Sequence, residues 1–239
     1  MYSLLILLSA LFGAATGALV PRARYRLSVE PEEAWRSSGP CGHAVAGWAG
    51  PARCRVCGGR YGPGALWPAL VAALVCAVSA AAVGARPELA VWLAAAPVAV
   101  LLAGVDWSVR RLPDVLTLPL AAGMAALLGV AALIPGAAGV WPRSLLGGLA
   151  LGGGYLALHL LHSAGLGFGD VKLAAALGCA LGWYGWWPLL LGTLAGLLLG
   201  SAYSWWLLAR EGRGAVMPLG PFMIAGAWLG ILLGAWTAG

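Results

Sequence analysis

The sequence predicts an all-α protein that crosses a lipid bilayer about eight times. Of its 239 residues, 62% are hydrophobic and only 9% are charged, whereas a soluble domain carries roughly 25% charged residues. The mean hydropathy is +0.89, and apolar runs long enough to span a bilayer recur along the chain. This composition excludes an ordinary soluble domain, a disordered chain and a protein that binds nucleic acid.

The apolar runs divide the chain into three parts. Residues 1–20 form the first span, and because Arg22, Arg24 and Arg26 follow it while no Lys or Arg precedes it, we expect a retained helix and not a cleaved signal. Residues 21–64 form a polar loop. Residues 65–239 hold seven further spans, at 66–84, 89–106, 115–134, 144–162, 171–184, 189–209 and 217–236.

The basic residues predict an orientation for this bundle. With the N-terminus outside, twelve of the 14 Lys and Arg residues fall on the inner side and only Arg86 and Arg143 fall outside, as the positive-inside rule requires. We therefore expect a multi-pass protein of the cell membrane with both termini outside and the loop in the cytosol. The net charge of +6 then reflects topology.

Glycines predict how the last two helices pack. Gly192, Gly196 and Gly200 recur at a spacing of four, and so do three glycines of the last span, at 226, 230 and 234. Small residues at this spacing let helix backbones approach closely in lipid. We expect contact within one bundle rather than between two copies.

Only five acids lie outside the polar loop: Glu88, Asp106, Asp114, Asp170 and Glu211. Glu88 and Glu211 are expected in loops, exposed to solvent. Asp106 ends the third span and Asp170 begins the sixth, so both meet the same membrane boundary. Two close carboxylates cannot both ionise cheaply, so one can act as an acid while the other activates water. A proton relay or a structural cap would use similar residues.

Glycine is frequent just before Asp170, at positions 165, 167 and 169. Because glycine lacks a side chain, we expect these positions to let a substrate backbone approach the carboxylate.

Three motifs, in this order and spacing, resemble the signatures of the type IV leader peptidases (prepilin peptidases), a family of GxGD intramembrane aspartic proteases. They are VDWSVRRLPDVLTLPL at 105–120, GFGDVKL at 167–173 and MPLGPF at 217–222. The resemblance covers about residues 66–236. It implies a GxGD-type helical bundle that cleaves the leader of type IV prepilins or pseudopilins at the cytoplasmic face, without a cofactor for proteolysis.

Carried over by position, the resemblance implies that Asp106 and Asp170 are the catalytic pair. Asp114, Gly167, Gly169 and Lys172 would support them. We expect Asp114 to cap the following helix, where an acid suits the positive end of the helix dipole. Lys172 either tunes the acidity of Asp170 or marks the inner interface.

The polar loop departs from the family pattern. Many members carry two Cys-x-x-Cys pairs here, associated with metal binding and with methylation of the new N-terminus. This chain keeps Cys54 and Cys57, but Ala44 stands where the partner of Cys41 would be. His43 could complete a structural zinc site; alternatively, these are residual cysteines kept reduced. A loop of about 44 residues argues against methyltransferase activity, and S-adenosylmethionine is expected only if that activity is retained.

His159 and His162 stand three residues apart in the fifth span. They are expected to form hydrogen bonds at a helix interface rather than to bind metal. Two other functions stay open for the chain as a whole: a small proton-coupled transporter that uses the two aspartates, and an inactive scaffold for pilus assembly.

Overall fold

The computed structural model describes residues 2–30, 32–162, 166–212 and 217–238; of the residues considered above, Gly165 and Arg213 lie outside them. In the described ranges the chain forms eight α-helices. They are α1 (Tyr2–Leu27), α2 (Leu66–Val83), α3 (Glu88–Val109), α4 (Asp114–Ala132), α5 (Trp141–Leu161), α6 (Phe168–Tyr184), α7 (Trp186–Glu211) and α8 (Gly220–Thr237).

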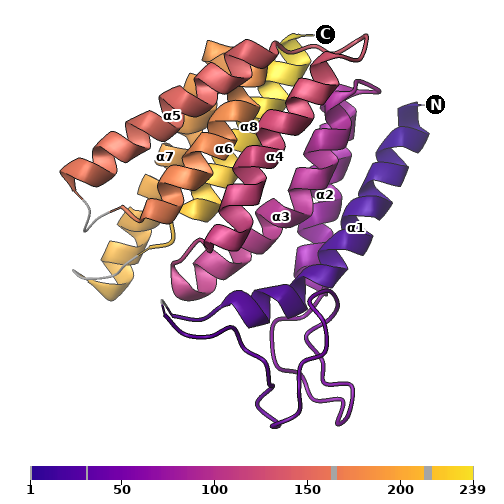
Figure 1. The fold of residues 1–239 in the computed structure, drawn as a ribbon, viewed down its shortest axis with the longest axis vertical. Helices are drawn as coiled ribbons and strands as arrows, with labels where there is room; N and C mark the ends of the chain where they lie inside the picture. Colours follow the sequence, from indigo (N-terminus) through magenta and orange to yellow (C-terminus); the bar gives the residue numbers. More distant parts are fainter. Residues whose placement is uncertain (1, 31, 163–165, 213–216, 239) are drawn as a thin grey trace.

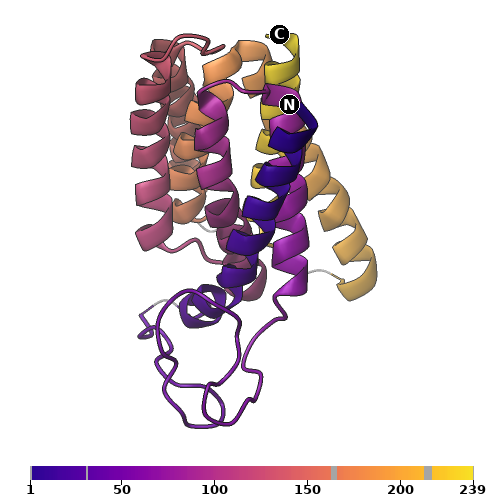
Figure 2. The same cartoon turned by 90° about the vertical axis from the view of Figure 1, so that its right-hand side faces the viewer.

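The helices form an up-and-down bundle in which consecutive helices run in opposite directions (Figure 1). Both termini lie at one end of the bundle, and the polar loop extends from the other end, below α1 (Figure 2). The C-terminal end of α3 and the N-terminal ends of α4, α6 and α8 therefore share the loop end of the bundle, which is where Asp106 and Asp170 lie.

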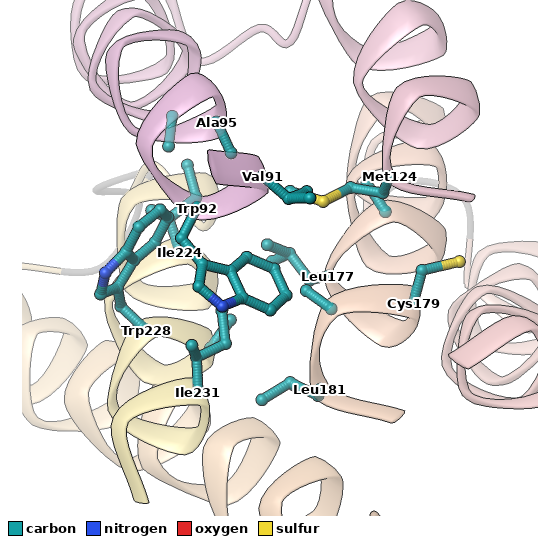
Figure 3. Packing of buried hydrophobic residues seen from close by; sticks show 14 of the residues in the cluster. Val91, Trp92, Ala95, Met124, Leu177, Cys179, Leu181, Ile224, Trp228 and Ile231 are labelled. Carbon is teal, nitrogen blue, oxygen red and sulfur yellow. The ribbon is translucent and has the colours of Figure 1, made fainter. Parts of the chain in front are cut away.

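Seven of the described helices are long and apolar enough to cross a membrane. The remaining one, α6, has 17 residues and lies at the centre of the bundle, where twelve of them are buried. Leu177 and Leu181 of α6 pack there against Trp92 of α3 and against Ile224 and Ile231 of α8 (Figure 3). These observations confirm an all-helical polytopic membrane protein.

The close packing predicted for the last two helices is confirmed. A Cβ atom on Gly226 of α8 would collide with the backbone of Gly192 and Gly196 on α7, so only glycine fits. The two backbones therefore touch within one chain, as expected for small residues in a membrane bundle.

The predicted helix limits were wrong by a few residues, most clearly at the first helix. It continues through Pro21 to Leu27 instead of ending at residue 20. Polar residues extend it because their side chains find partners: Arg22 is 5% exposed and its guanidinium bonds to the carbonyl oxygens of Ala46 (2.8 Å) and Ala49 (2.9 Å) in the loop.

Two acids were expected in loops, and both lie on helices. Glu211 is the exposed last residue of α7. Glu88 was predicted to be solvated, but it is the first residue of α3 and is fully buried. Its Oε1 accepts a hydrogen bond from the backbone N–H of Ala138 (3.3 Å), and its Oε2 has no described partner. Glu88 thus contacts the α4–α5 connection, which the local sequence could not show.

Candidate active site

Asp106 lies in the last turn of α3 and is only 4% exposed. Its Oδ2 accepts a hydrogen bond from the backbone N–H of Gly220 (2.9 Å), the first residue of α8. A Cβ atom at Gly220 would lie 2.9 Å from that same oxygen. Glycine at this position thus allows the start of α8 to hold the carboxylate directly.

Asp170 is held in a similar way at the start of α6. Its Oδ2 accepts a hydrogen bond from the backbone N–H of Gly167 (3.1 Å), the residue that precedes the helix. The Asp170 N–H in turn donates to the Gly167 carbonyl oxygen (3.0 Å). Each aspartate therefore has one oxygen oriented by a glycine N–H, which leaves its second oxygen free of that bond.

Gly169, one of the glycines expected to make room for a substrate, packs closely against the protein itself. A Cβ atom there would lie 2.8 Å from Cβ and 3.0 Å from the carbonyl oxygen of Leu112. The missing side chain makes room for the α3–α4 connection of the protein itself. This contact brings α6 against the segment that follows Asp106.

The two aspartates line one cavity of about 300 Å³ at the loop end of the bundle. Its wall comes from the end of α3, the start of α4 and the start of α6. The lining residues are Asp106, Arg110, Arg111, Leu112, Asp114, Gly167, Phe168, Gly169, Asp170 and Lys172. All six residues expected at the site thus lie around the same space.

Asp114 does not cap α4, contrary to expectation. It is the first residue of that helix, after Pro113, and no side-chain capping bond forms. Instead its Oδ1 pairs with Nζ of Lys172 on α6 at 2.6 Å, and the Lys172 ammonium also lies 4.7 Å from the ring centre of Phe168. The pair joins the first turns of α4 and α6 across the cavity, which only the tertiary structure could show.

The four residues expected to bind metal in the loop come together. One ligand atom from each of Cys41, His43, Cys54 and Cys57 lies within 4.8 Å of the others. Backbone N–H groups of Cys57 and Val56 lower the pKa of the Cys54 thiol to about 6, which favours the thiolate, the form that binds metal. Two or three thiolates with an imidazole are the donor set that Zn²⁺ prefers in structural sites.

Arginine side chains of α1 bind this loop to the helix. Besides its two carbonyl bonds, Arg22 donates from Nε to the Tyr61 hydroxyl (3.2 Å). The Arg26 guanidinium lies 4.1 Å from the ring centre of Trp48 and donates to the Gly47 carbonyl oxygen (3.0 Å). The loop is therefore held at a defined place below the bundle, on the same end as the aspartates.

His159 forms a hydrogen bond, as expected, but its partner lies in the connection before α6 and not on a helix. Its Nδ1 is hydrogen-bonded to the carbonyl oxygen of Leu166 (2.7 Å), just before the start of α6. The expectation was wrong for His162, which is exposed just after the end of α5 and not at a helix interface. Neither belongs to the metal-type cluster found among the described residues.

Comparisons with known proteins identify relatives of this chain. The type IV leader peptidase family profile matches residues 93–205, which include both aspartates. A prepilin leader peptidase/N-methyltransferase of Pseudomonas putida is 31% identical over 216 residues, covering 81% of this chain and 70% of that protein. This chain belongs to the type IV leader peptidase family. It is therefore a peptidase built in the membrane, as the three motifs indicated.

Other relatives carry the same printed name. One from Burkholderia pseudomallei (strain K96243) is 34% identical, with 85% of this chain and 67% of the relative covered. One from Aeromonas hydrophila is 35% identical, with 57% of this chain and 47% of the relative covered. The chain thus spans between about half and 70% of the length of these family members. No solved structure matches it.

Proposed function

We propose that this chain cleaves the N-terminal leader of type IV prepilins or pseudopilins, by water activation between Asp106 and Asp170. The supporting observation is that both carboxylates line one cavity while a backbone N–H orients one oxygen of each. The names of the relatives, which include prepilin leader peptidase, support the substrate class.

In the proposed reaction one carboxylate takes a proton from water, and the resulting hydroxide adds to the scissile carbonyl carbon. The other aspartate, protonated, donates its proton to the carbonyl oxygen as negative charge develops there. The tetrahedral intermediate then collapses, the C–N bond breaks, and a carboxyl group returns a proton to the leaving amine. Two close carboxylates suit this scheme because they share one proton readily.

The Lys172–Asp114 pair would act as a support in this scheme. Lys172 stands two residues after Asp170, and its partner begins the helix that follows the Asp106 segment. The ion pair would therefore keep the first turns of α4 and α6 at a fixed separation while substrate enters the cavity.

The loop would hold a structural zinc ion through Cys41, His43, Cys54 and Cys57. The converging ligand atoms and the lowered pKa of Cys54 support this assignment. A bound ion would stabilise a loop whose own buried apolar cluster is small, with Val45, Ala52, Cys54 and Tyr61. The loop lacks one complete Cys pair, so we propose peptidase activity without methylation.

For the whole molecule we propose an orientation with both termini outside, so that the cavity opens at the cytoplasmic face. Arg22, Arg24 and Arg26 at the loop end support this orientation. The proposed division is a first helix, a cytosolic loop and a seven-helix peptidase core.

The function is tested by incubating the purified protein with a synthetic prepilin and reading the products by mass spectrometry. We expect one cut that releases the leader, and no added methyl group when S-adenosylmethionine is present. An uncut substrate, with the protein folded, would favour the scaffold function, and a mass gain of one methyl group would overturn the view on methylation.

A further inference from the structure

A second, larger cavity lies beside the site, since Trp107, next to Asp106, and Pro221, next to Gly220, are among its lining residues. It is an apolar groove of about 440 Å³ bounded by α1, α2, α3 and α8, together with the end of the loop. None of its lining residues lines the cavity of the aspartates. Along α3 its lining runs from Trp107 to Ala96, which at 1.5 Å per residue is about 16 Å. One leaflet of a bilayer core is about 15 Å thick, so the groove is about as long as one leaflet is thick.

The loop end of the groove carries a positive charge. The Arg24 side chain lies over Gly104, where an added Cβ atom would approach its Cδ to 2.9 Å. Arg24 donates from Nε (3.3 Å) and Nη2 (2.8 Å) to the hydroxyl of Ser108. The only ion pair within the described ranges is Lys172–Asp114, so the Arg24 guanidinium is held against a neutral hydroxyl with no carboxylate on it.

The rest of the groove is apolar. Ala96, Ala99 and Ala103 give α3 a wall of small side chains. Trp228 of α8, labelled in Figure 3, also lines the groove, and its indole N–H donates to the Ser79 hydroxyl (2.9 Å). The polar atom of this ring is thus satisfied inside the protein, so the indole adds no unpaired donor to the wall.

The mouth of the groove has the character of a membrane interface. Trp67, at the start of α2, lines the groove and is 75% exposed, and tryptophans gather at the level of lipid headgroups. Arg24 and Trp67 lie at the same end of the bundle, while Val75, Ala96 and Trp228 lie deeper. The groove therefore presents a positive charge at the headgroup level and apolar side chains below it. These features match the phosphate and the acyl chains of a phospholipid.

We propose that this groove binds one anionic phospholipid, with its phosphate on Arg24 and one acyl chain along Ala103–Ala96 of α3. A guanidinium forms paired hydrogen bonds with phosphate oxygens, and basic pockets between membrane helices bind anionic headgroups. An acyl chain fills apolar space that would otherwise lack partner atoms. Because Arg24 is positively charged, this site should prefer a lipid with a net negative charge. The general lipid-facing surface contacts acyl chains through apolar side chains and offers no such charge.

Lipid retention tests the proposal. Wild type, Arg24→Gln, Arg24→Lys and Ala99→Phe are reconstituted in vesicles of phosphatidylcholine with phosphatidylglycerol, extracted gently and weighed by native mass spectrometry. We expect wild type to retain one phosphatidylglycerol in preference to phosphatidylcholine. Arg24→Gln should reduce that preference roughly fivefold, Arg24→Lys should keep most of it, and Ala99→Phe should lower retention of both lipids by filling the groove. Free inorganic phosphate should not displace the lipid, because it offers no acyl chain.

Three outcomes would overturn the proposal. The first is equal retention of the two lipids by folded wild type. The second is unchanged preference in Arg24→Gln, and the third is displacement by phosphate alone. A photoreactive residue at Val71, which lines the groove, distinguishes a bound lipid from a bound substrate. Crosslinks to lipid support the proposal, whereas crosslinks to a prepilin in place of lipid would assign the groove to the substrate. Thermal unfolding of each variant identifies one that has simply failed to fold.

Discussion

Gly220→Ala should slow peptide cleavage by disturbing a single carboxylate. The added Cβ atom would lie 2.9 Å from Oδ2 and 3.3 Å from Cγ of Asp106. Ordinary contacts of a Cβ atom begin near 3.4 Å, so the carboxylate must move by about 0.5 Å (3.4 minus 2.9). That movement lengthens the hydrogen bond from the Gly220 N–H, now 2.9 Å.

The magnitude follows from that hydrogen bond. A hydrogen bond to a charged group contributes about 1.5–3 kcal/mol, and each 1.36 kcal/mol corresponds to a tenfold change in rate. If the bond matters mainly in the transition state, kcat/KM should fall roughly 10- to 150-fold. The fall should appear mainly in kcat, because misplacing a reacting group slows chemistry more than binding.

The assay is cleavage of a synthetic prepilin by purified protein, with kcat and KM measured separately. Gly123→Ala is the matched control, because a Cβ atom on that α4 glycine meets nothing within 4 Å; it should cleave at the wild-type rate. Thermal unfolding checks that both variants fold. A folded Gly220→Ala protein with wild-type kcat/KM would refute the reasoning that α8 positions the Asp106 carboxylate.

Three further changes test other parts of the structure. Asp114→Asn removes the ion pair with Lys172. Because the Asp114 side chain is 61% exposed, the loss of stability should stay within about 1 kcal/mol, and cleavage should fall less than tenfold. Complete inactivity of the folded variant would show that the wrong acid was paired with Asp170. Glu88→Ala should lower the melting temperature, since it opens a cavity and frees the Ala138 N–H, whereas Glu88→Gln keeps an acceptor and should melt near wild type; equal melting of all three would contradict this. Replacing Cys54 and Cys57 with Ser should abolish bound zinc, measured by elemental analysis, while part of the cleavage survives, and wild type purified without metal yet fully active would discard the zinc proposal.

Patterns within single helices were enough to predict the bundle and the ends at which Asp106 and Asp170 lie. Apolar length sets where a span can begin and end, and the parity of the spans places both residues at one boundary. Predictions failed where the partner lies far along the chain. Asp114 pairs with Lys172, 58 residues later, and Glu88 accepts a hydrogen bond from Ala138, 50 positions away.

The same reason explains two features that were missed. Gly220 belongs to a recognised motif, but its bond to Asp106 crosses 114 residues. Arg22 extends the first helix because loop carbonyls surround its guanidinium. In both cases the neighbouring sequence does not indicate which distant group the glycine or the arginine contacts.

The central claim is that Asp106 and Asp170 act together as one catalytic unit. The most direct test is the cleavage rate of Asp106→Asn, Asp170→Asn and the double variant, each folded and inserted, on the same prepilin. Asparagine keeps the shape but supplies neither acid nor base, so each single change should abolish turnover and the double change should add no further loss. Appreciable turnover by either single variant would contradict the two-aspartate mechanism.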